Sequence, residues 1–245
     1  MKKHPCPVGL PKYGHLLQYN GRLVGVILLI STAIPSSGAS ATRCNVSSWY
    51  VDPAFRGYAT FLSSRATSNR NLTYVNVSPA PHTLPLIEGQ GFMRYSSGQF
   101  VTFAGSARRC PRARVFEVGC TRDWQFDSAE RELLLDHAKY SCISLWCETP
   151  TDAHPFVFLP RLIKGFVPCA QLIFCRSIDD FVKFRGPLAR FLALQGRPLI
   201  LIDANGPIRG LTGMYFDEVA PKYFKGPQCP RLGDLAYTEA AMFGV

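Results

Sequence analysis

The chain has 245 residues, of which 47% are hydrophobic, and it carries a formal net charge of +10. This length suits one large domain or two small ones, and the hydrophobic content excludes disorder over most of the chain. A basic balance favours anionic partners. The Lys and Arg residues are nevertheless scattered, apart from a cluster at Arg108–Arg114, and no basic face is interleaved with aromatic residues. The sequence therefore argues against nucleic-acid binding.

The first half of the chain alternates strand and helix patterns. It opens with an irregular Pro-containing segment, followed by strands at 15–19 and 22–32 that the turn dipeptide Asn20-Gly21 joins into a hairpin. The further elements expected in this half are a loop at 35–41, a strand at 44–51, a helix at 56–68, a strand at 72–77, a short helix at 82–90 and a bent strand or strand pair at 92–104.

The apolar run Leu23–Ile34 also permits a second interpretation. Together with the small-residue site at Ser37–Ala41 it is typical of a secretory signal peptide. That leader would be about 41 residues long, beyond the usual 15–30. We favour a central strand in a cytoplasmic protein, and secretion stays an alternative. The run of 12 residues is too short to span a bilayer, so we expect no membrane span.

The nine cysteines form no Cys-x-x-Cys pair, and no His cluster lies at the spacing of zinc ligands. The sequence therefore predicts no metal site. We interpret the cysteines as buried free thiols in a reducing compartment. If the chain is secreted, they could instead form disulfides.

One stretch of the first half offers a candidate phosphate site. The strand Ser48–Val51 leads through the turn Asp52-Pro53 into a helix that we expect to open at Arg56. The first turn of a helix has backbone N–H groups without an internal partner and the positive end of the helix dipole. Gly57 and Ala59 are small enough to let an anion approach those groups, and Arg56 adds a cation.

The run Tyr50–Gly57 resembles the acyl-CoA-binding segment of the GCN5-related N-acetyltransferase (GNAT) superfamily. In that family a strand ends in a V-x-P-x-x-R-G turn, and the pattern Q/R-x-x-G-x-G/A wraps the CoA pyrophosphate. Arg56 matches the first position of this pattern, whereas Ala59 replaces its first glycine and Phe61 its last small residue. The run Gly91–Tyr95 resembles the closing G-F segment of the family. The family's opening strand and two helices are absent, because only about 14 residues precede the hairpin.

The resemblance implies a mixed α+β fold, with a central, mostly antiparallel sheet flanked by helices, and acetyl-CoA or another acyl-CoA as cosubstrate. It implies that the pantetheine arm runs along the strand that ends in Trp49–Val51 and past the next strand. The cofactor-binding residues that it assigns are Trp49, Val51, Arg56, Gly57, Tyr58, Ala59, Thr60, Asn76 and Ser78.

The catalytic residues are less clear than the binding residues. Many family members carry a Tyr general acid four residues before the Gly of the closing segment, and that position is Ile87 here. The strand that precedes the candidate phosphate site has no carboxylate but offers Tyr50. His82 is the remaining acid–base candidate, because an imidazole titrates near neutrality. A lone His at the start of a helix is more often structural.

The second half begins after a basic segment at 106–127, which we interpret as a linker between a domain at 1–105 and a second half at 128–245. Ser128 is the expected N-cap of a helix at 128–140. The elements that follow are strands near 142–148, 155–160 and 169–177, a helix at 178–194, a strand at 198–203, turns and strands at 210–215, and a terminal strand within 234–243. This order suggests a second, degenerate copy of the same fold, although an unrelated α/β extension would also explain it. Arg185–Pro187 lies inside a helix pattern, so we expect no phosphate cradle there.

The sequence therefore favours an acyltransferase that moves an acyl group, most often acetyl in this family, from acyl-CoA to an amine or hydroxyl of a small molecule or protein. The first alternative is a catalytically impaired acyl-CoA-binding or scaffold protein, which the departures at Ala59, Phe61 and Ile87 support. The second is a secreted disulfide-containing protein. A homodimer in which a second subunit supplies the missing front elements also stays open.

Overall fold

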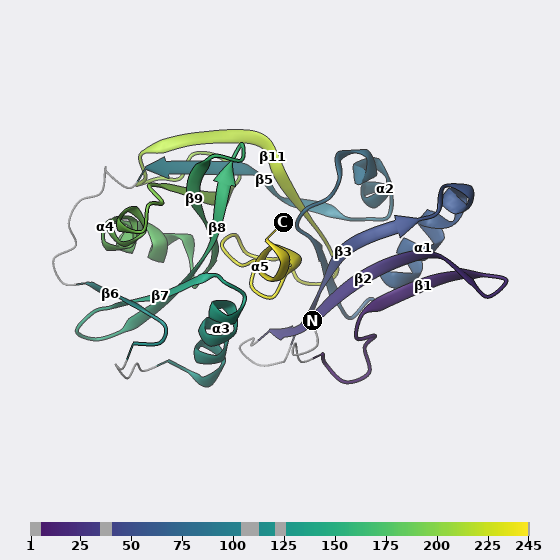
Figure 1. Cartoon of the computed structure of the whole chain (residues 1–245), viewed down its shortest axis with the longest axis horizontal. Coiled ribbons are helices and arrows are strands. Elements are labelled where there is room, and N and C mark those ends of the chain that lie inside the picture. The colour runs from purple at the N-terminus through teal and green to yellow at the C-terminus, as the bar shows by residue number, and fades with distance from the viewer. Residues whose placement is uncertain (1–5, 35–40, 104–112, 121–125, 245) are drawn as a thin grey trace. The chain divides into compact units, whose positions relative to one another are not determined.

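The computed structural model of the chain describes residues 6–34, 41–103, 113–120 and 126–244 (Figure 1). The chain divides into two compact units, Met1–Tyr95 with Pro221–Pro230 and Ser96–Ala220 with Arg231–Val245. The sequence placed the first boundary at residue 105. The units divide earlier, within strand β5 (Met93–Phe103), because this strand pairs from Gly98 onward with β10 (Leu199–Ala204) of the second unit.

The first unit contains a row of hydrogen-bonded strands and two short helices. Its strands are β1 (Gly14–Tyr19), β2 (Arg22–Ile34), β3 (Ala41–Val51), β4 (Thr73–Asn76) and the end of β11 (Gly213–Lys225), paired in that order. Its helical elements are the 3₁₀ turns η1 (Pro53–Tyr58) and η2 (Pro81–Thr83) and the helices α1 (Ala59–Ala66) and α2 (Leu84–Gly89). All pairings are antiparallel except that of β3 with β4. The strands predicted at 15–19, 22–32, 44–51 and 72–77 are confirmed.

The β1–β2 hairpin turns at the predicted dipeptide. Asn20 and Gly21 have φ angles of 48° and 79°. A two-residue turn whose twist matches that of the strands needs positive φ at both positions, and Asn-Gly tolerates this better than other dipeptides.

The helix predicted at 56–68 differs at both ends. The chain starts to wind earlier, as the 3₁₀ turn η1, and the α-helix begins only at Ala59 and ends at Ala66. Pro53 explains the early start, because its fixed φ and missing N–H suit the first position of a helix. The carboxylate of Asp52 caps this turn by accepting a hydrogen bond from the N–H of Ala54 at 3.2 Å.

Helix α1 packs against β1 and β2 (Figure 1). Its buried residues Leu62 and Ala66 join a core cluster with side chains from the sheet and from α2. Ile87 of α2 belongs to this cluster and is 3% exposed. The position that the resemblance assigns to a general acid is therefore a packing position here, as the apolar Ile87 already indicated.

The second unit contains a longer series of strands and the larger helices. Its strands pair in the order β5, β10, β9 (Val167–Cys175), β8 (Ala153–Ile163), β7 (Ile143–Glu148) and β6 (Arg114–Glu117), and its helices are α3 (Ser128–Lys139), α4 (Ile178–Leu194) and α5 (Glu239–Phe243). The core forms where α4 covers the sheet, with Phe181, Phe184 and Leu188 fully buried. Helix α4 has the predicted bounds.

Two predictions in the second half are wrong. The N-cap of α3 is Asp127 rather than Ser128, because the Asp127 carboxylate accepts from the N–H of Glu130 at 2.7 Å. The terminal strand is helix α5, which the helix-favouring Ala240 and Ala241 explain. The segment interpreted as a linker contains strand β6, which pairs with β7. The turns and strands expected at 210–215 are found in part, since the 13-residue strand β11 begins at Gly213.

No helix in the described part of the chain is long and apolar enough to cross a membrane. Most of the small-residue site of the alternative signal peptide, and most of the basic cluster at 108–114, lie outside the described residues. The eight cysteines that the structure describes carry free thiols. Burial raises the pKa of Cys44 to about 11 and of Cys142 and Cys175 to about 12.

Candidate functional site

The site begins where strand β3 separates from its parallel neighbour β4. Only Arg43–Asn45 pair with Thr73–Val75, whereas β3 continues for six residues to Val51. A strand that extends beyond its paired neighbour leaves backbone groups at its free end that a ligand can contact. The candidate site lies along this free end.

A β-bulge marks the point of separation. Leu29 of β2 stands opposite Val46, but Ile27 stands opposite Trp49, so β3 has one extra residue at Ser47-Ser48. A bulge bends a strand and disrupts the ladder locally. We infer that it directs the end of β3 away from β4. The sequence carried no specific signal for this bulge, because two serines within an alternating strand pattern are compatible with regular pairing.

The turn after β3 is fixed by Asp52. Its N–H donates to the carbonyl of Val24 at 2.8 Å, and its carboxylate forms an ion pair with Arg22 at 3.1 Å. The hairpin β1–β2 therefore holds the turn from which η1 starts. Because the Asp52 carboxylate is engaged in these contacts, it is a structural group rather than a catalytic base.

The phosphate site predicted at the start of the helix is only partly present. The N–H of Ala59, the first residue of α1, donates to the carbonyl of Arg56 and is therefore not available to an anion. Gly57 is open, since a Cβ built on it meets no atom within 4 Å. Arg56 is exposed. The cationic side chain and the open approach remain, while one of the expected amides is used by the 3₁₀ turn.

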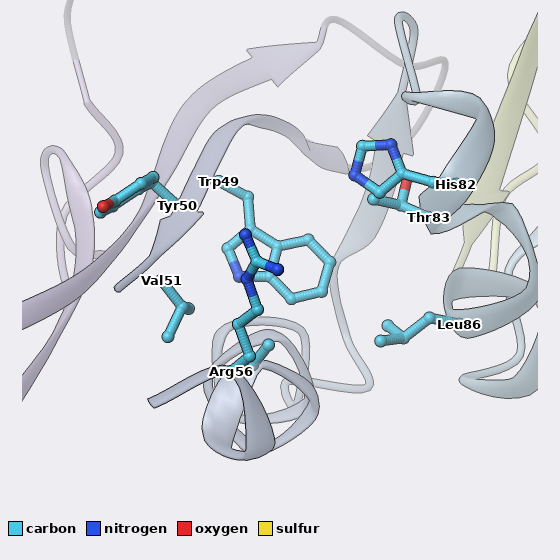
Figure 2. A pocket seen from close by; sticks show the side chains of 8 residues that line it. Trp49, Tyr50, Val51, Arg56, His82, Thr83 and Leu86 are labelled. Carbon is cyan, nitrogen blue, oxygen red and sulfur yellow. The ribbon is translucent and has the colours of Figure 1, made fainter. Parts of the chain in front are cut away.

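A pocket of about 420 Å³ lies beside this turn. Its lining consists of Trp49, Tyr50, Val51, Arg56, Ala59, His82, Thr83 and Leu86. Figure 2 shows the indole of Trp49 near the centre of the view, with Arg56 extending from η1 and Leu86 from α2. The structure thus brings together the two predicted catalytic candidates and four of the predicted binding residues. Thr83 and Leu86 were not predicted, because neither matches a chemical motif.

Five predicted binding residues do not line the pocket: Gly57, Tyr58, Thr60, Asn76 and Ser78. The carbonyl of Thr60 accepts a hydrogen bond from Gln90 instead. Asn76 pairs with Tyr223 of β11 on the far side of β4 from β3. Tyr50 contributes to the pocket, but its ring points away from Trp49 (Figure 2) and is 61% exposed.

The walls of the pocket are held together by Gln90, which follows α2. Its amide nitrogen donates to the carbonyl of Thr60 at 3.2 Å and to the hydroxyl of Ser64 at 3.1 Å, and the hydroxyl of Ser63 donates to its amide oxygen at 2.6 Å. These three bonds join α1 to the end of α2. We infer that they help to hold the segment that carries His82 and Leu86 in position.

The chemistry of the lining suits an anionic ligand with apolar parts. It contains one permanent cation, Arg56, and no carboxylate. The indole nitrogen of Trp49 is buried and has no hydrogen-bond acceptor among the residues that the structure describes. A buried donor without a partner costs about 1–3 kcal/mol, so a ligand that supplies an acceptor oxygen gains affinity here.

The sequence matches no protein-family model, and no curated protein is significantly similar to it. Solved structures do match. A GCN5-related N-acetyltransferase from Anabaena variabilis is 12% identical with a TM-score of 0.54, and the match covers 85% of this chain and 61% of that protein. The GCN5-related glucosamine N-acetyltransferase region of a fungal multi-domain β-N-acetylglucosaminidase is 6% identical with a TM-score of 0.53, over 83% of this chain and 32% of that protein. Eis1 from Mycobacterium abscessus is 14% identical with a TM-score of 0.48, over 93% of this chain and 68% of that protein.

The two matches with TM-scores above 0.5 define the class of fold. The chain has the fold of the GCN5-related N-acetyltransferases. The predicted mixed α+β architecture, with mostly antiparallel pairing and flanking helices, is confirmed.

Proposed function

We propose that the first unit binds acyl-CoA in the pocket beside η1 and transfers the acyl group to an amine or hydroxyl. The observation that carries this proposal is the position of the pocket, at the point where β3 separates from β4 and the chain turns into η1 and α1. The acyltransferases of this fold named above support the same class of reaction.

The residues of the pocket fit the chemistry of an acyl-CoA. Arg56 would attract the diphosphate, since a guanidinium binds phosphate oxygens strongly. Trp49 would donate its indole N–H to an oxygen of the pantetheine arm, while Val51 and Leu86 contact the apolar parts of that arm. No lining carboxylate would repel the phosphates.

The transfer itself needs few groups from the protein. The nitrogen of the acceptor attacks the thioester carbonyl, the carbon–sulfur bond breaks, and CoA leaves as a thiolate. We assign His82 to accept the proton that the nitrogen loses and to return it to the thiolate, because it is the only imidazole in the lining. Tyr50 is a weaker candidate for this acid, because its ring points away from the indole (Figure 2).

Calorimetric titration with CoA and acetyl-CoA tests the binding step. We expect specific binding and a higher melting temperature with ligand, because a ligand that binds the folded state stabilises it. CoA release with a panel of amines and alcohols then tests the transfer. Absence of binding by both CoA species would reject the proposal.

A His82→Gln variant separates catalysis from binding. We expect kcat to fall about 100-fold, the usual contribution of a general base, with little change in the Kd of acetyl-CoA. If kcat keeps its value and its pH profile in this variant, His82 moves no proton in the reaction.

The buried Ile87 favours a second candidate function, acyl-CoA binding without turnover. A residue that is 3% exposed and apolar cannot replace the acid that many proteins of this fold carry at that position. Measurable binding of acetyl-CoA without CoA release for any acceptor would favour this candidate over the transferase.

A further inference from the structure

The second unit repeats the strand pattern that creates the site in the first unit. In each unit three antiparallel strands are followed by a helix and then by a strand parallel to the third. These are β1–β2–β3, α1 and β4 in the first unit, and β7–β8–β9, α4 and β10 in the second. This repetition concerns pairing and register, which the element order of the sequence alone could not establish.

The register of the third strand is repeated as well. Strand β9 pairs with β10 over three residues, Cys169–Gln171, as β3 pairs with β4 over Arg43–Asn45. Val157 stands opposite Phe174 and Phe158 opposite Leu172, so Ile173 is an extra residue in β9. Each third strand therefore carries a bulge that starts two residues after its last parallel pair.

The free end of β9 is covered by the chain's own segment 231–235, whereas no described segment is paired with the free end of β3 on the side of β4. The N–H of Leu235 donates to the carbonyl of Ile173 at 2.7 Å, and the N–H of Cys175 donates to the carbonyl of Gly233 at 3.0 Å. Phe174 and Asp234 form an antiparallel bridge between these two bonds. The segment therefore occupies the edge of β9 as an added strand would.

The side chain of Arg231 secures this segment. Its guanidinium donates to the carbonyl of Cys175 and lies over the ring of Phe174, with 5.1 Å between the guanidinium carbon and the ring centroid. At the inner end of the segment, Leu235 is 2% exposed.

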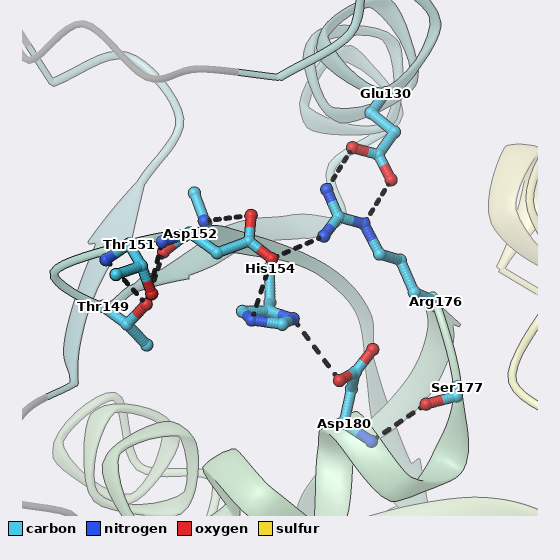
Figure 3. Close-up of polar contacts among 9 residues, drawn as sticks. Glu130, Thr149, Thr151, Asp152, His154, Arg176, Ser177 and Asp180 are labelled. Carbon is cyan, nitrogen blue, oxygen red and sulfur yellow. Dashed lines mark hydrogen bonds and ion pairs between the residues drawn. The ribbon is translucent and has the colours of Figure 1, made fainter.

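The helix start next to this edge also differs from that of the first unit. The first turn of α4 contains Asp179 and Asp180, whereas η1 has no acidic residue in its first turn. Ser177 caps α4 by accepting from the N–H of Asp180 at 3.0 Å, and the Asp180 carboxylate lies 3.4 Å from Nδ1 of His154 (Figure 3). Carboxylates at this position disfavour the approach of a phosphate.

The contacts around His154 hold this acidic start in place. Nε2 of His154 lies 3.4 Å from the carboxylate of Asp152, which also contacts Arg176 at 3.4 Å (Figure 3). Arg176 in turn forms two hydrogen bonds to Glu130, at 2.7 and 2.8 Å. The side chains at this helix start contact one another, while Nδ1 of His154 has no hydrogen-bond partner among the described residues.

We propose that the second unit carries a closed counterpart of the acyl-CoA site, in which residues 231–235 of the same chain take the place of the ligand's amide-bearing arm. This inference rests on the proposed function of the first unit. It follows that one chain binds one acyl-CoA, in the first unit. In the second unit the covered end of β9 has a structural role and binds no acyl-CoA.

Gly233 offers a test of the closed edge. Its φ is +74°, and a Cβ on it would lie 2.8 Å from Sγ of Cys175, so Gly233→Ala should loosen segment 231–235. Gly244→Ala is the matched control, because Gly244 has a φ of +72° and a Cβ there meets no atom within 4 Å. Arg231→Ala serves as a second loosening variant should Gly233→Ala fail to fold.

Hydrogen exchange at the amides of Cys175 and Leu235 reports on the edge directly. We expect exchange about tenfold faster in Gly233→Ala or Arg231→Ala and unchanged in Gly244→Ala, since local opening exposes hydrogen-bonded amides. In the loosened variant, S-methylpantetheine, an uncharged arm with two amides, should slow this exchange again. Equal exchange in all variants, or no effect of S-methylpantetheine, overturns the inference while the proposed function stands.

Calorimetry on the unmodified chain completes the test. We expect one CoA per chain, with exchange at Cys175 and Leu235 unaffected by CoA. Binding of two CoA per chain would overturn the inference that the second site is closed, while the proposed function of the first unit would stand. No CoA at all overturns the proposed function and this inference with it.

Discussion

The hydroxyl of Ser63 on α1 donates to the amide oxygen of Gln90, beyond α2, at 2.6 Å. This bond and the two that the Gln90 nitrogen makes to α1 join α1 to the end of α2, which carries the lining residue Leu86 and is preceded by His82. Gln90 does not itself line the pocket. Gln90 can therefore affect the proposed reaction only by positioning the residues that do line the pocket.

Gln90→Ala should loosen the pocket without removing any of its groups. We expect the affinity for CoA to fall about fivefold, because each hydrogen bond of this kind contributes about 1 kcal/mol to holding the wall. Titration calorimetry measures this. Gln195→Ala is the control, since Gln195 also follows a helix directly, in the second unit, and is exposed. Equal affinity in the two variants would contradict the role of Gln90.

Gly57→Trp should block the open approach beside η1. A Cβ at this position meets no protein atom within 4 Å, so we expect the fold to tolerate the substitution and the melting temperature to stay within about 2 °C. We expect the affinity for CoA to fall about tenfold or more, because the new ring would occupy the approach to the anion site. Gly89→Trp, at an equally open position in α2, should leave the affinity unchanged. Unchanged affinity in Gly57→Trp would exclude this face of η1 as part of the site.

The two predicted features of the helix start show what the sequence could and could not determine. Arg56 and the openness at Gly57 follow from residue type, and the structure has both. The pairing of the Ala59 N–H with the Arg56 carbonyl does not, because it depends on Pro53 and Asp52 starting a 3₁₀ turn ahead of the α-helix. Local backbone geometry decides which amides are available, and a residue pattern reports that geometry only indirectly.

For the sheet, too, the sequence predicts the local features but not those that depend on distant partners. The apolar run Leu23–Ile34 and the Asn20-Gly21 turn predict the β1–β2 hairpin, since both signals are local. Two features depend instead on partners far away in the sequence. They are the pairing of β11 with β4 in the first unit and the pairing of β5 with β10 in the second. The bulge at Ser47-Ser48 likewise becomes visible only when β3 is aligned with β2.

Arg56→Ala should weaken CoA binding by charge alone. The side chain is exposed, so the loss should be smaller than that from Gly57→Trp, about threefold to fivefold at low salt. It should shrink further as salt is raised, because the Debye length falls to about 8 Å at physiological ionic strength. Arg65→Ala, on the last turn of α1, is the control and should have no effect on the affinity. A salt dependence identical in both variants would argue against a contact between Arg56 and the diphosphate.

The thiols provide a prediction about pH that also addresses the secreted alternative. The raised pKa values of Cys44, Cys142 and Cys175, caused first by burial, favour the neutral thiol in the folded state. The unfolded chain therefore releases these protons at lower pH than the folded one, and the free energy of unfolding should decrease as the pH rises above 9, toward 11 or 12. Denaturant titrations between pH 8 and 10.5 measure this trend.

Thiol labelling tests the same assignment at single residues. At pH 8, iodoacetamide should modify the exposed Cys120 and Cys229 first and leave the five buried thiols unmodified until the chain unfolds. Disulfides found by mass spectrometry in the purified protein would instead favour the secreted interpretation.

Trp49→Phe should separate ligand binding from folding. The variant keeps an aromatic ring in the pocket but removes the indole N–H, which has no acceptor among the described residues. We expect the affinity for CoA to fall about fivefold, the value of one hydrogen bond, with the melting temperature unchanged or slightly higher. Trp146→Phe should do the opposite: Trp146 is 0% exposed and stacks on Phe116 in the second unit, so its truncation should cost about 2 kcal/mol of stability and leave CoA binding intact. Full affinity in Trp49→Phe would show that the ligand does not use the indole nitrogen.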